Sequence, residues 1–287
     1  MEKLALQVGL YLMMAFGIMQ MVSPGTLLEQ YKLDMGSVSN VEKSNIFNMM
    51  NTQGWNLFSS AALASMTIRK NDPNTVSAML FMNMILYTLY AAHAYFTAMP
   101  VAATWGMPLE GMYFNIALFF GLGVFNFMAW KKTGGNIPKT GNPPMEMRYH
   151  ALRVSYALNI FFGLIAYFAT DKLMETYNVD TAGSSMYKSM LPFFVKEFGF
   201  SLASVGFGMM AIISQKDDDM IYALNRFFGY ASLVMFMVLC GQKNYYIATS
   251  QENQIGGINF NLVLYTVTFV LNLQAMLNVD VGKMKED

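Results

Sequence analysis

The sequence contains little of what catalytic and nucleic-acid-binding proteins are usually built from. Of its 287 residues one is cysteine and two are histidine, and the formal net charge at pH 7 is zero. A single cysteine excludes an intrachain disulfide, and two histidines are too few for a metal site built from histidines. A chain with no excess of positive charge offers no broad basic surface to nucleic acid. We therefore expect no nucleic-acid partner and no bound metal.

Charged residues are also scarce, at 13% of the chain, whereas 55% of the residues are hydrophobic and 15% are aromatic. The apolar residues form eight blocks of about 18 to 25 residues, each long enough to cross a hydrocarbon core of about 30 Å as a helix. Helices are the expected form, because backbone groups in lipid must bond to one another. The sequence thus predicts an all-α polytopic membrane protein with eight transmembrane helices. The predicted spans are residues 4–22, 46–68, 75–99, 111–130, 151–170, 190–213, 220–240 and 257–277. The first is interpreted as a retained helix and not as a signal peptide, because no clear small-residue cleavage site follows it.

One pattern of residues occurs twice, with a displacement of 146 residues. Gly111, Phe114, Asn115, Leu118, Val124 and Asn126 recur as Gly257, Phe260, Asn261, Leu264, Val270 and Asn272. This predicts a tandem duplication, with a first four-helix repeat over residues 1–132 and a second over residues 151–287. Residues 133–150, rich in glycine and proline, form the expected linker. Four spans per repeat is an even number, so the two repeats should insert in parallel, with the same orientation.

The distribution of positive charge predicts which side holds the chain ends. Twelve lysines and arginines flank the face that contains both termini and the central linker, against six on the other face. By the positive-inside rule, both termini should be cytosolic or on the equivalent side of an organelle. The final residues, Lys283 to Asp287, resemble the dilysine retrieval signal of the endoplasmic reticulum, which favours that membrane or another organelle membrane.

Two further features recur in both predicted repeats. Residues 27–34 and 173–180 share leucine or methionine, glutamate, tyrosine and aspartate in register, which predicts a short amphipathic segment on the membrane surface, with an ordinary loop as the alternative. The predicted spans 46–68 and 190–213 are rich in glycine, alanine and serine. Small residues let membrane helices approach closely, so we expect these two spans to pack against each other.

The repeated asparagines are candidate ligand-binding residues. Asn115 and Asn126 are 11 residues apart, which returns to within about 20° of the same helix face, and Asn261 and Asn272 repeat the arrangement. A helix face that carries an amide near each end is not expected to face lipid. The two interpretations are interhelical hydrogen bonding and the lining of a site for a polar head group.

Ionisable residues inside predicted spans are the other candidates. Lys196 and Glu197 lie one to two turns inside their predicted span, where the first repeat has Asn51 and Thr52. They either gate or bind a polar solute, or pair with neighbours and reach to the interface. His93, whose repeat counterpart is Val238, is either a hydrogen-bonded packing residue or the ligand of a pigment or haem iron.

No motif in the sequence points to catalysis. We find no phosphate-binding glycine loop and no nucleophile paired with a histidine base. The 28 methionines suit adaptable packing against flat apolar ligands, and metal transport through their thioethers is the less favoured alternative. The sequence therefore favours a non-catalytic structural or accessory subunit of a membrane complex, holding lipid or pigment between its helices and contacting membrane lipids and other membrane proteins. The alternative is a small-molecule transporter or channel that uses the cleft between the two repeats.

Overall fold

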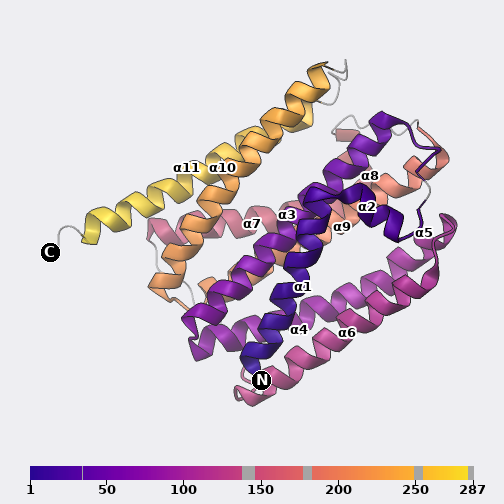
Figure 1. The fold of residues 1–287 in the computed structure, drawn as a ribbon. Coiled ribbons are helices and arrows are strands. Elements are labelled where there is room, and N and C mark those ends of the chain that lie inside the picture. The colour runs from indigo at the N-terminus through magenta and orange to yellow at the C-terminus, as the bar shows by residue number, and fades with distance from the viewer. Residues whose placement is uncertain (34, 138–145, 177–182, 249–254, 284–287) are drawn as a thin grey trace.

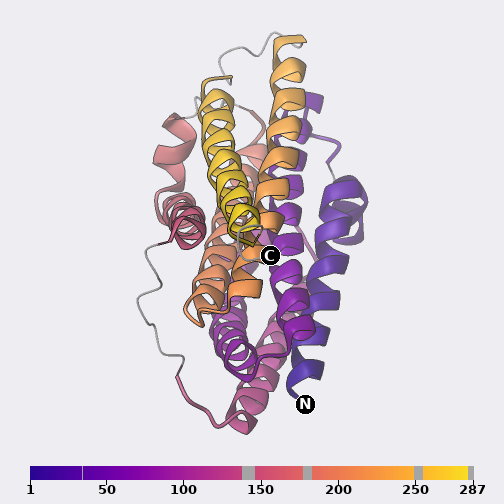
Figure 2. The same cartoon turned by 90° about the vertical axis from the view of Figure 1, so that its left-hand side faces the viewer.

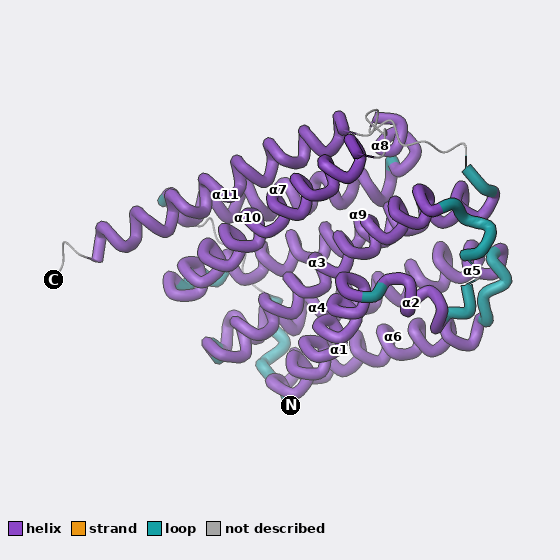
Figure 3. The backbone as a smooth tube through the Cα atoms, turned by 45° about the horizontal axis from the view of Figure 1, so that its top comes forward, coloured by secondary structure: helices purple, strands orange, loops and turns teal. Residues whose placement is uncertain are grey.

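The computed structural model describes residues 1–33, 35–137, 146–176, 183–248 and 255–283, and every regular element in these ranges is a helix (Figure 3). The helices are α1 (Glu2–Val22), α2 (Pro24–Gln30), α3 (Asn40–Lys70), α4 (Pro73–His93), the π-helix η1 (Ala94–Ala98), α5 (Met99–Thr104), α6 (Leu109–Lys132), α7 (Met147–Phe168), α8 (Thr170–Thr176), α9 (Ser185–Ile213), α10 (Asp218–Ala248) and α11 (Ile255–Lys283). The predicted all-α class is confirmed.

Within the described residues, six helical segments are long and apolar enough to cross a membrane, and they indicate a multi-pass integral membrane protein. They are α1, the continuous run Pro73–Thr104, α6, α7, α9 and α10. The predicted spans 46–68 and 257–277 are not among them. The first lies in α3, which carries many amide side chains, and the second lies in α11, whose apolar stretch Asn261–Leu277 is shorter than a full span.

The helices form two groups with the same internal packing. In the first group α1 packs on α3 and α4 on α6, and in the second group α7 packs on α9 and α10 on α11 (Figures 1 and 2). The groups meet where α3 lies against α9. The predicted contact between these two small-residue helices is therefore confirmed, and Asn56 of α3 donates a hydrogen bond of 3.0 Å to Ser201 Oγ of α9.

Glycine pairs bring two sets of helix backbones together. A Cβ built on Gly17 of α1 would lie 2.9 Å from the carbonyl oxygen of Gly54 in α3, and one built on Gly54 would lie 2.7 Å from that of Gly17. Gly163 of α7 and Gly199 of α9 show the same reciprocal clash, at 2.7 and 2.6 Å. Because these distances are shorter than any side chain tolerates, glycine is required at all four positions.

The first and fifth predicted spans end in the same way. α1 ends at Val22 and α7 at Phe168, and in each case a seven-residue helix, α2 or α8, begins after one intervening residue, Ser23 or Ala169. These short helices lie where the surface segments were predicted, although residues 177–182 are outside the described ranges. Leu27 and Leu28 of α2 are buried against the main helices, so the apolar side of this segment turns inward as expected. Residues 138–145 of the predicted linker and residues 284–287 of the C-terminal lysine motif are also outside the described ranges.

One carboxylate caps helices of both groups. Glu42, in the first turn of α3, accepts hydrogen bonds from the backbone N–H groups of Ser39 and Ser184, which precede α3 and α9. Burial alone would raise the pKa of Glu42, but these hydrogen bonds to the charged form outweigh it, and the pKa is lowered. At the opposite ends of these helices, Lys70 forms ion pairs with Asp217 and Asp219. Polar contacts therefore join the two groups at both ends of the α3 and α9 pair.

Candidate functional site

Glu197 is a buried carboxylate near the middle of α9. It lies 12 residues after Ser185, the first residue of α9, which is a rise of about 18 Å, and its exposed fraction is 4%. This is about three turns from the start of α9, which begins five residues before the predicted span at Met190. A buried ionisable group costs several kcal/mol unless it is paired, so its partners are the first place to look for a site.

The helix of His93 is irregular at that residue. α4 ends at His93, the π-helix η1 follows, and the N–H of Met99 bonds to the carbonyl of Ala94, five residues back. Pro100 has no N–H to give, and its ring displaces the carbonyl of the preceding turn, which accounts for the local widening. π-Helical segments often occur at functional sites. The corresponding helix of the second group, α10, is α-helical throughout.

His93 and Glu197 form a buried pair although 104 residues separate them. Nε2 of His93 lies 2.7 Å from Oε1 of Glu197, and Nδ1 lies 2.9 Å from the hydroxyl of Tyr167. Phe200 stacks on the imidazole with 5.8 Å between ring centroids. Both ring nitrogens are thus engaged by protein groups, which favours the hydrogen-bonded histidine over the pigment or haem ligand.

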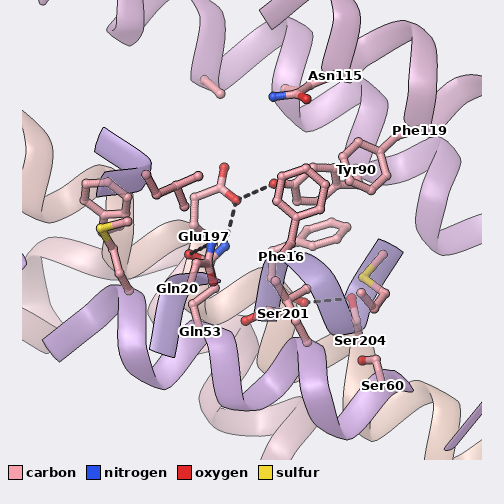
Figure 4. A pocket seen from close by; sticks show the side chains of 18 of the residues that line it. Phe16, Gln20, Gln53, Ser60, Tyr90, Asn115, Phe119, Glu197, Ser201 and Ser204 are labelled. Atoms are coloured by element: carbon pink, nitrogen blue, oxygen red, sulfur yellow. Dashed lines mark hydrogen bonds between the residues drawn. The ribbon is translucent and has the colours of Figure 1, made fainter. Parts of the chain in front are cut away.

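Three polar side chains extend the pair into a cluster. Tyr90 donates its hydroxyl proton to Oε2 of Glu197 at 3.0 Å, and the Gln53 amide donates to the same oxygen at 3.4 Å. Gln20 in turn donates to Oε1 of Gln53 at 3.3 Å (Figure 4). The remaining oxygen of Gln20 is buried and has no hydrogen-bond partner. The cluster therefore ends in an unused acceptor, and such an acceptor is costly in a dry interior.

This cluster forms part of the wall of a cavity of about 190 Å³, which we call the first cavity. α1, α3, α4, α6 and α9 line it, and Gln20, Gln53, Tyr90 and Glu197 are among the lining residues. Figure 4 shows Asn115 of α6 across the cavity from Glu197, with Phe16, Tyr90 and Phe119 gathered at one side. The site thus combines a polar end with an apolar, aromatic body, as ligand pockets commonly do.

A second cavity, of about 260 Å³, lies in the other group of helices. Many residues of its wall lie 145 or 146 residues after lining residues of the first cavity or, in α3, 145 residues before them. Phe162, Leu202, Asn261 and Tyr265 of the second cavity correspond in this way to Phe16, Leu57, Asn115 and Phe119 of the first. Each cavity is also lined by a helix of the other group. α9, from the second group, lines the first cavity, and α3, from the first group, lines the second.

The polar cluster exists in the first cavity and not in the second. The positions of Gln20, Gln53, Tyr90, His93 and Glu197 correspond to Ala166, Phe198, Met235, Val238 and Thr52. Four of these replacements are apolar, and the fifth is neutral. The second cavity instead gathers amides, with Asn45, Asn48, Asn56, Asn159, Gln242 and Asn261 in its wall. The two groups of helices therefore have the same internal packing but enclose two chemically different cavities.

The four repeated asparagines divide into two pairs. Asn115 and Asn261 line the first and second cavities, and Asn115 also donates to the Tyr31 hydroxyl at 3.2 Å. Asn126 and Asn272 are fully buried, and each donates to the carbonyl four residues before it. Asn115 and Asn261 therefore lie in cavity walls, whereas Asn126 and Asn272 bond to carbonyls of their own helices, and Asn272 also donates to Ser155 Oγ of α7 at 3.3 Å.

Lys196 is not brought to the site. It is partly exposed and belongs to the lining of neither cavity, although Glu197 follows it directly. Among the described residues, no group of three or more His, Cys, Asp or Glu side chains could hold a metal ion. His93 and Glu197 were predicted as separate candidates, and neither their pairing nor the part of Tyr167 was predicted. One signal was present, because the positions 145 residues away hold Val238 and Thr52, neither of which is ionisable.

No protein-family model, curated protein or solved structure matches this chain.

Proposed function

We propose that the chain is a tandem duplication of a four-helix unit. The helix breaks at Ser23 and Ala169, the paired glycines and the two cavities all recur at a spacing of 145 or 146 residues. The helix caps do so as well, since Asp72 and Asp217 each accept a hydrogen bond from the backbone N–H three residues later. Residues 1–132 and 151–287 are the two units, and residues 133–150 link them.

Eight transmembrane spans follow from this duplication. α3 has 31 residues and α11 has 29, and each exceeds the roughly 20 residues that a span requires. The low hydropathy of α3 is compatible with a span, because its polar side chains Asn45, Gln53 and Asn56 are buried against other helices and do not face lipid.

An eight-span chain has both termini on one side of the membrane, and the charge asymmetry assigns them to the cytosolic side. Single cysteines replacing Lys3 and Lys285, in a Cys240→Ser background, should be labelled from the same face of sealed vesicles. Labelling from opposite faces would require an odd number of spans and would overturn this topology.

The function best supported by the geometry is the non-catalytic holding of small amphipathic molecules between membrane helices. The observation that carries it is the pair of repeat-equivalent cavities, each with a polar part and an apolar body. Lipid is the most abundant molecule of this kind around the protein, and a flat pigment is the other candidate. A protein that holds such molecules without acting on them fits the role of a structural or accessory subunit of a membrane complex.

Filling each cavity tests this function. Ser204 and Ser59 are equivalent residues that line the first and second cavities. In protein extracted with its surrounding lipid, Ser204→Phe should remove the molecules bound in the first cavity and Ser59→Phe those bound in the second, as measured by mass spectrometry of the copurified lipids. Gly121→Phe is the matched control, because a side chain there meets no neighbouring atom within 4 Å. If all three variants retain the lipids of the unmodified protein, the cavities do not hold ligands.

A small-molecule transporter is the second candidate, and the buried pair of His93 and Glu197 is the observation that favours it, since such pairs occur in proton and solute pathways. The originally expected route, a cleft between the repeats, is less favoured because hydrogen bonds join α3 and α9 along that boundary. Uptake of a solute into proteoliposomes that is lost on Ser204→Phe would favour transport over simple holding.

A further inference from the structure

The first cavity carries one formal negative charge with no basic side chain in its wall. Glu197 lines it, and no lysine or arginine is found among its described lining residues. His93 satisfies both of its ring nitrogens without a positive charge when the proton is on Nε2, because Nε2 then donates to Glu197 and Nδ1 accepts from Tyr167. In this state the buried Glu197 carboxylate gives the cluster a net charge of −1. A bound cation would neutralise it.

Two acceptors in the wall have unused capacity. A carboxylate has about four lone-pair sites, and Glu197 uses three of them, one on Oε1 and two on Oε2. The Gln20 oxygen is buried and accepts nothing. Gln53 connects the two, since it donates to Glu197 and accepts from Gln20. A ligand group that donates several hydrogen bonds would complete this set.

The aromatic walls also suit a cation. Phe16, Tyr90, Phe119 and Phe200 line the cavity from four different helices. The ring centroid of Tyr90 lies 4.4 Å from that of Phe119 and 5.3 Å from that of Phe200. Faces of aromatic rings attract cations, and the attraction is stronger where water is excluded. A carboxylate beside such rings is a combination that recognises ammonium groups.

We propose that the first cavity binds the primary or secondary ammonium group of an amphiphile, with Glu197 and Gln20 as its acceptors. An N–H-bearing ammonium is chosen over a quaternary one because the two open acceptors require donors. The second cavity, with Thr52 at the position of Glu197 and amides in its wall, takes a neutral polar head group. This inference rests on the proposed ligand-holding function and adds the head-group chemistry that separates the two cavities.

The tryptophans provide a readout for each cavity. Trp105 lines the first and Trp55 the second, whereas Trp130 lines neither. Two single-tryptophan proteins are reconstituted in phosphatidylcholine nanodiscs, one retaining Trp105 (Trp55→Phe, Trp130→Phe) and one retaining Trp55 (Trp105→Phe, Trp130→Phe). Each is titrated with brominated dodecylamine and with brominated dodecanol, whose bromine atoms quench tryptophan fluorescence. The amine should quench Trp105 at a membrane mole fraction at least tenfold lower than the alcohol, and Trp55 should show no such preference.

Substitution then assigns the preference to the carboxylate. Glu197→Gln keeps the size and one acceptor but removes the charge, and should reduce the amine preference at Trp105 to about onefold. Thr52→Val, at the equivalent position of the second cavity, should leave the amine preference at Trp105 unchanged. Three results would each overturn the ammonium assignment while leaving ligand holding intact. Both probes could quench Trp105 equally, Trp55 could show the same preference for the amine as Trp105, or the preference at Trp105 could survive Glu197→Gln. Absence of quenching by either probe at both tryptophans would overturn ligand holding itself. If Glu197→Gln does not fold, the comparison of Trp105 with Trp55 still decides the assignment.

Discussion

Valine in place of Gly163 or Gly199 is expected to lower the free energy of unfolding by about 3 kcal/mol, near the upper end of the cost of overpacking a close-packed site. The Cβ of a side chain at Gly163 would lie 2.5 Å from the backbone nitrogen of Ala203. Backbone atoms of a helix have no rotamer by which to move away, so α7 and α9 would have to separate. The measurement is thermal or denaturant unfolding in detergent, with helical content followed by circular dichroism.

The chain offers a control and a repeat of this experiment. Gly121→Val introduces the same side chain into a helix at a position with no neighbour within 4 Å, and should change the free energy of unfolding by less than about 1 kcal/mol. Valine at Gly17 or Gly54 should cost as much as at Gly163 or Gly199, because the α1 and α3 contact has the same geometry. Equal, small effects at the contact glycines and at Gly121 would show that these helices do not approach as described.

The parts of the fold that could be predicted from the sequence follow from periodic apolar composition. Long apolar blocks predicted the all-helical class, and small residues predicted the contact between α3 and α9. Helix starts were less well predicted, because hydropathy marks where a helix enters lipid and not where it begins. α9 starts at Ser185, five residues before its apolar block, since Ser184 caps it with a bond to the backbone N–H of Tyr187. This difference moved Glu197 from the edge of its helix to its middle.

The candidate site was only partly predictable, because its members come from helices that are distant in sequence. Glu197, His93 and Tyr167 belong to α9, α4 and α7, and composition carries no information on which faces of these helices meet. The π-helix after His93 was also missed. Pro100 signals a local break, but the sequence alone does not say that the chain continues as one helix through it.

The assembly of the cluster explains why only one cavity is charged. Gln20, Gln53 and Tyr90 come from the first group of helices, whereas Tyr167 and Glu197 come from the second. Either group of helices alone therefore lacks part of the cluster. The packing of α3 on α9 creates two corresponding junctions between the groups, and a substitution at one junction does not alter the residues of the other. Under the proposed duplication, such substitutions would let the two cavities hold different ligands.

Leucine in place of His93 is expected to have the other large effect, a loss of about 3 kcal/mol in the free energy of unfolding, because it takes a hydrogen-bond donor away from a buried carboxylate. The Glu197 carboxylate would keep the donors Tyr90 and Gln53 but lose its shortest contact, the 2.7 Å bond to Nε2. Val238→Leu, at the equivalent position of α10, is the control and should change stability by less than about 1 kcal/mol.

The double variant separates an electrostatic cost from a packing cost. Leucine at position 93 fills a comparable space whether residue 197 is glutamate or glutamine, so a packing defect would persist in the variant that combines His93→Leu with Glu197→Gln. A defect that comes from the carboxylate would be smaller in the double variant, because a neutral amide loses less than a carboxylate does when one hydrogen-bond donor is removed. We therefore expect His93→Leu to cost at least about 1.5 kcal/mol less in the Glu197→Gln background than alone, within the range of interaction energies measured for contacting pairs. The same cost in both backgrounds would mean that His93 only fills space beside Phe200, and that its hydrogen bond to the Glu197 carboxylate contributes nothing to stability.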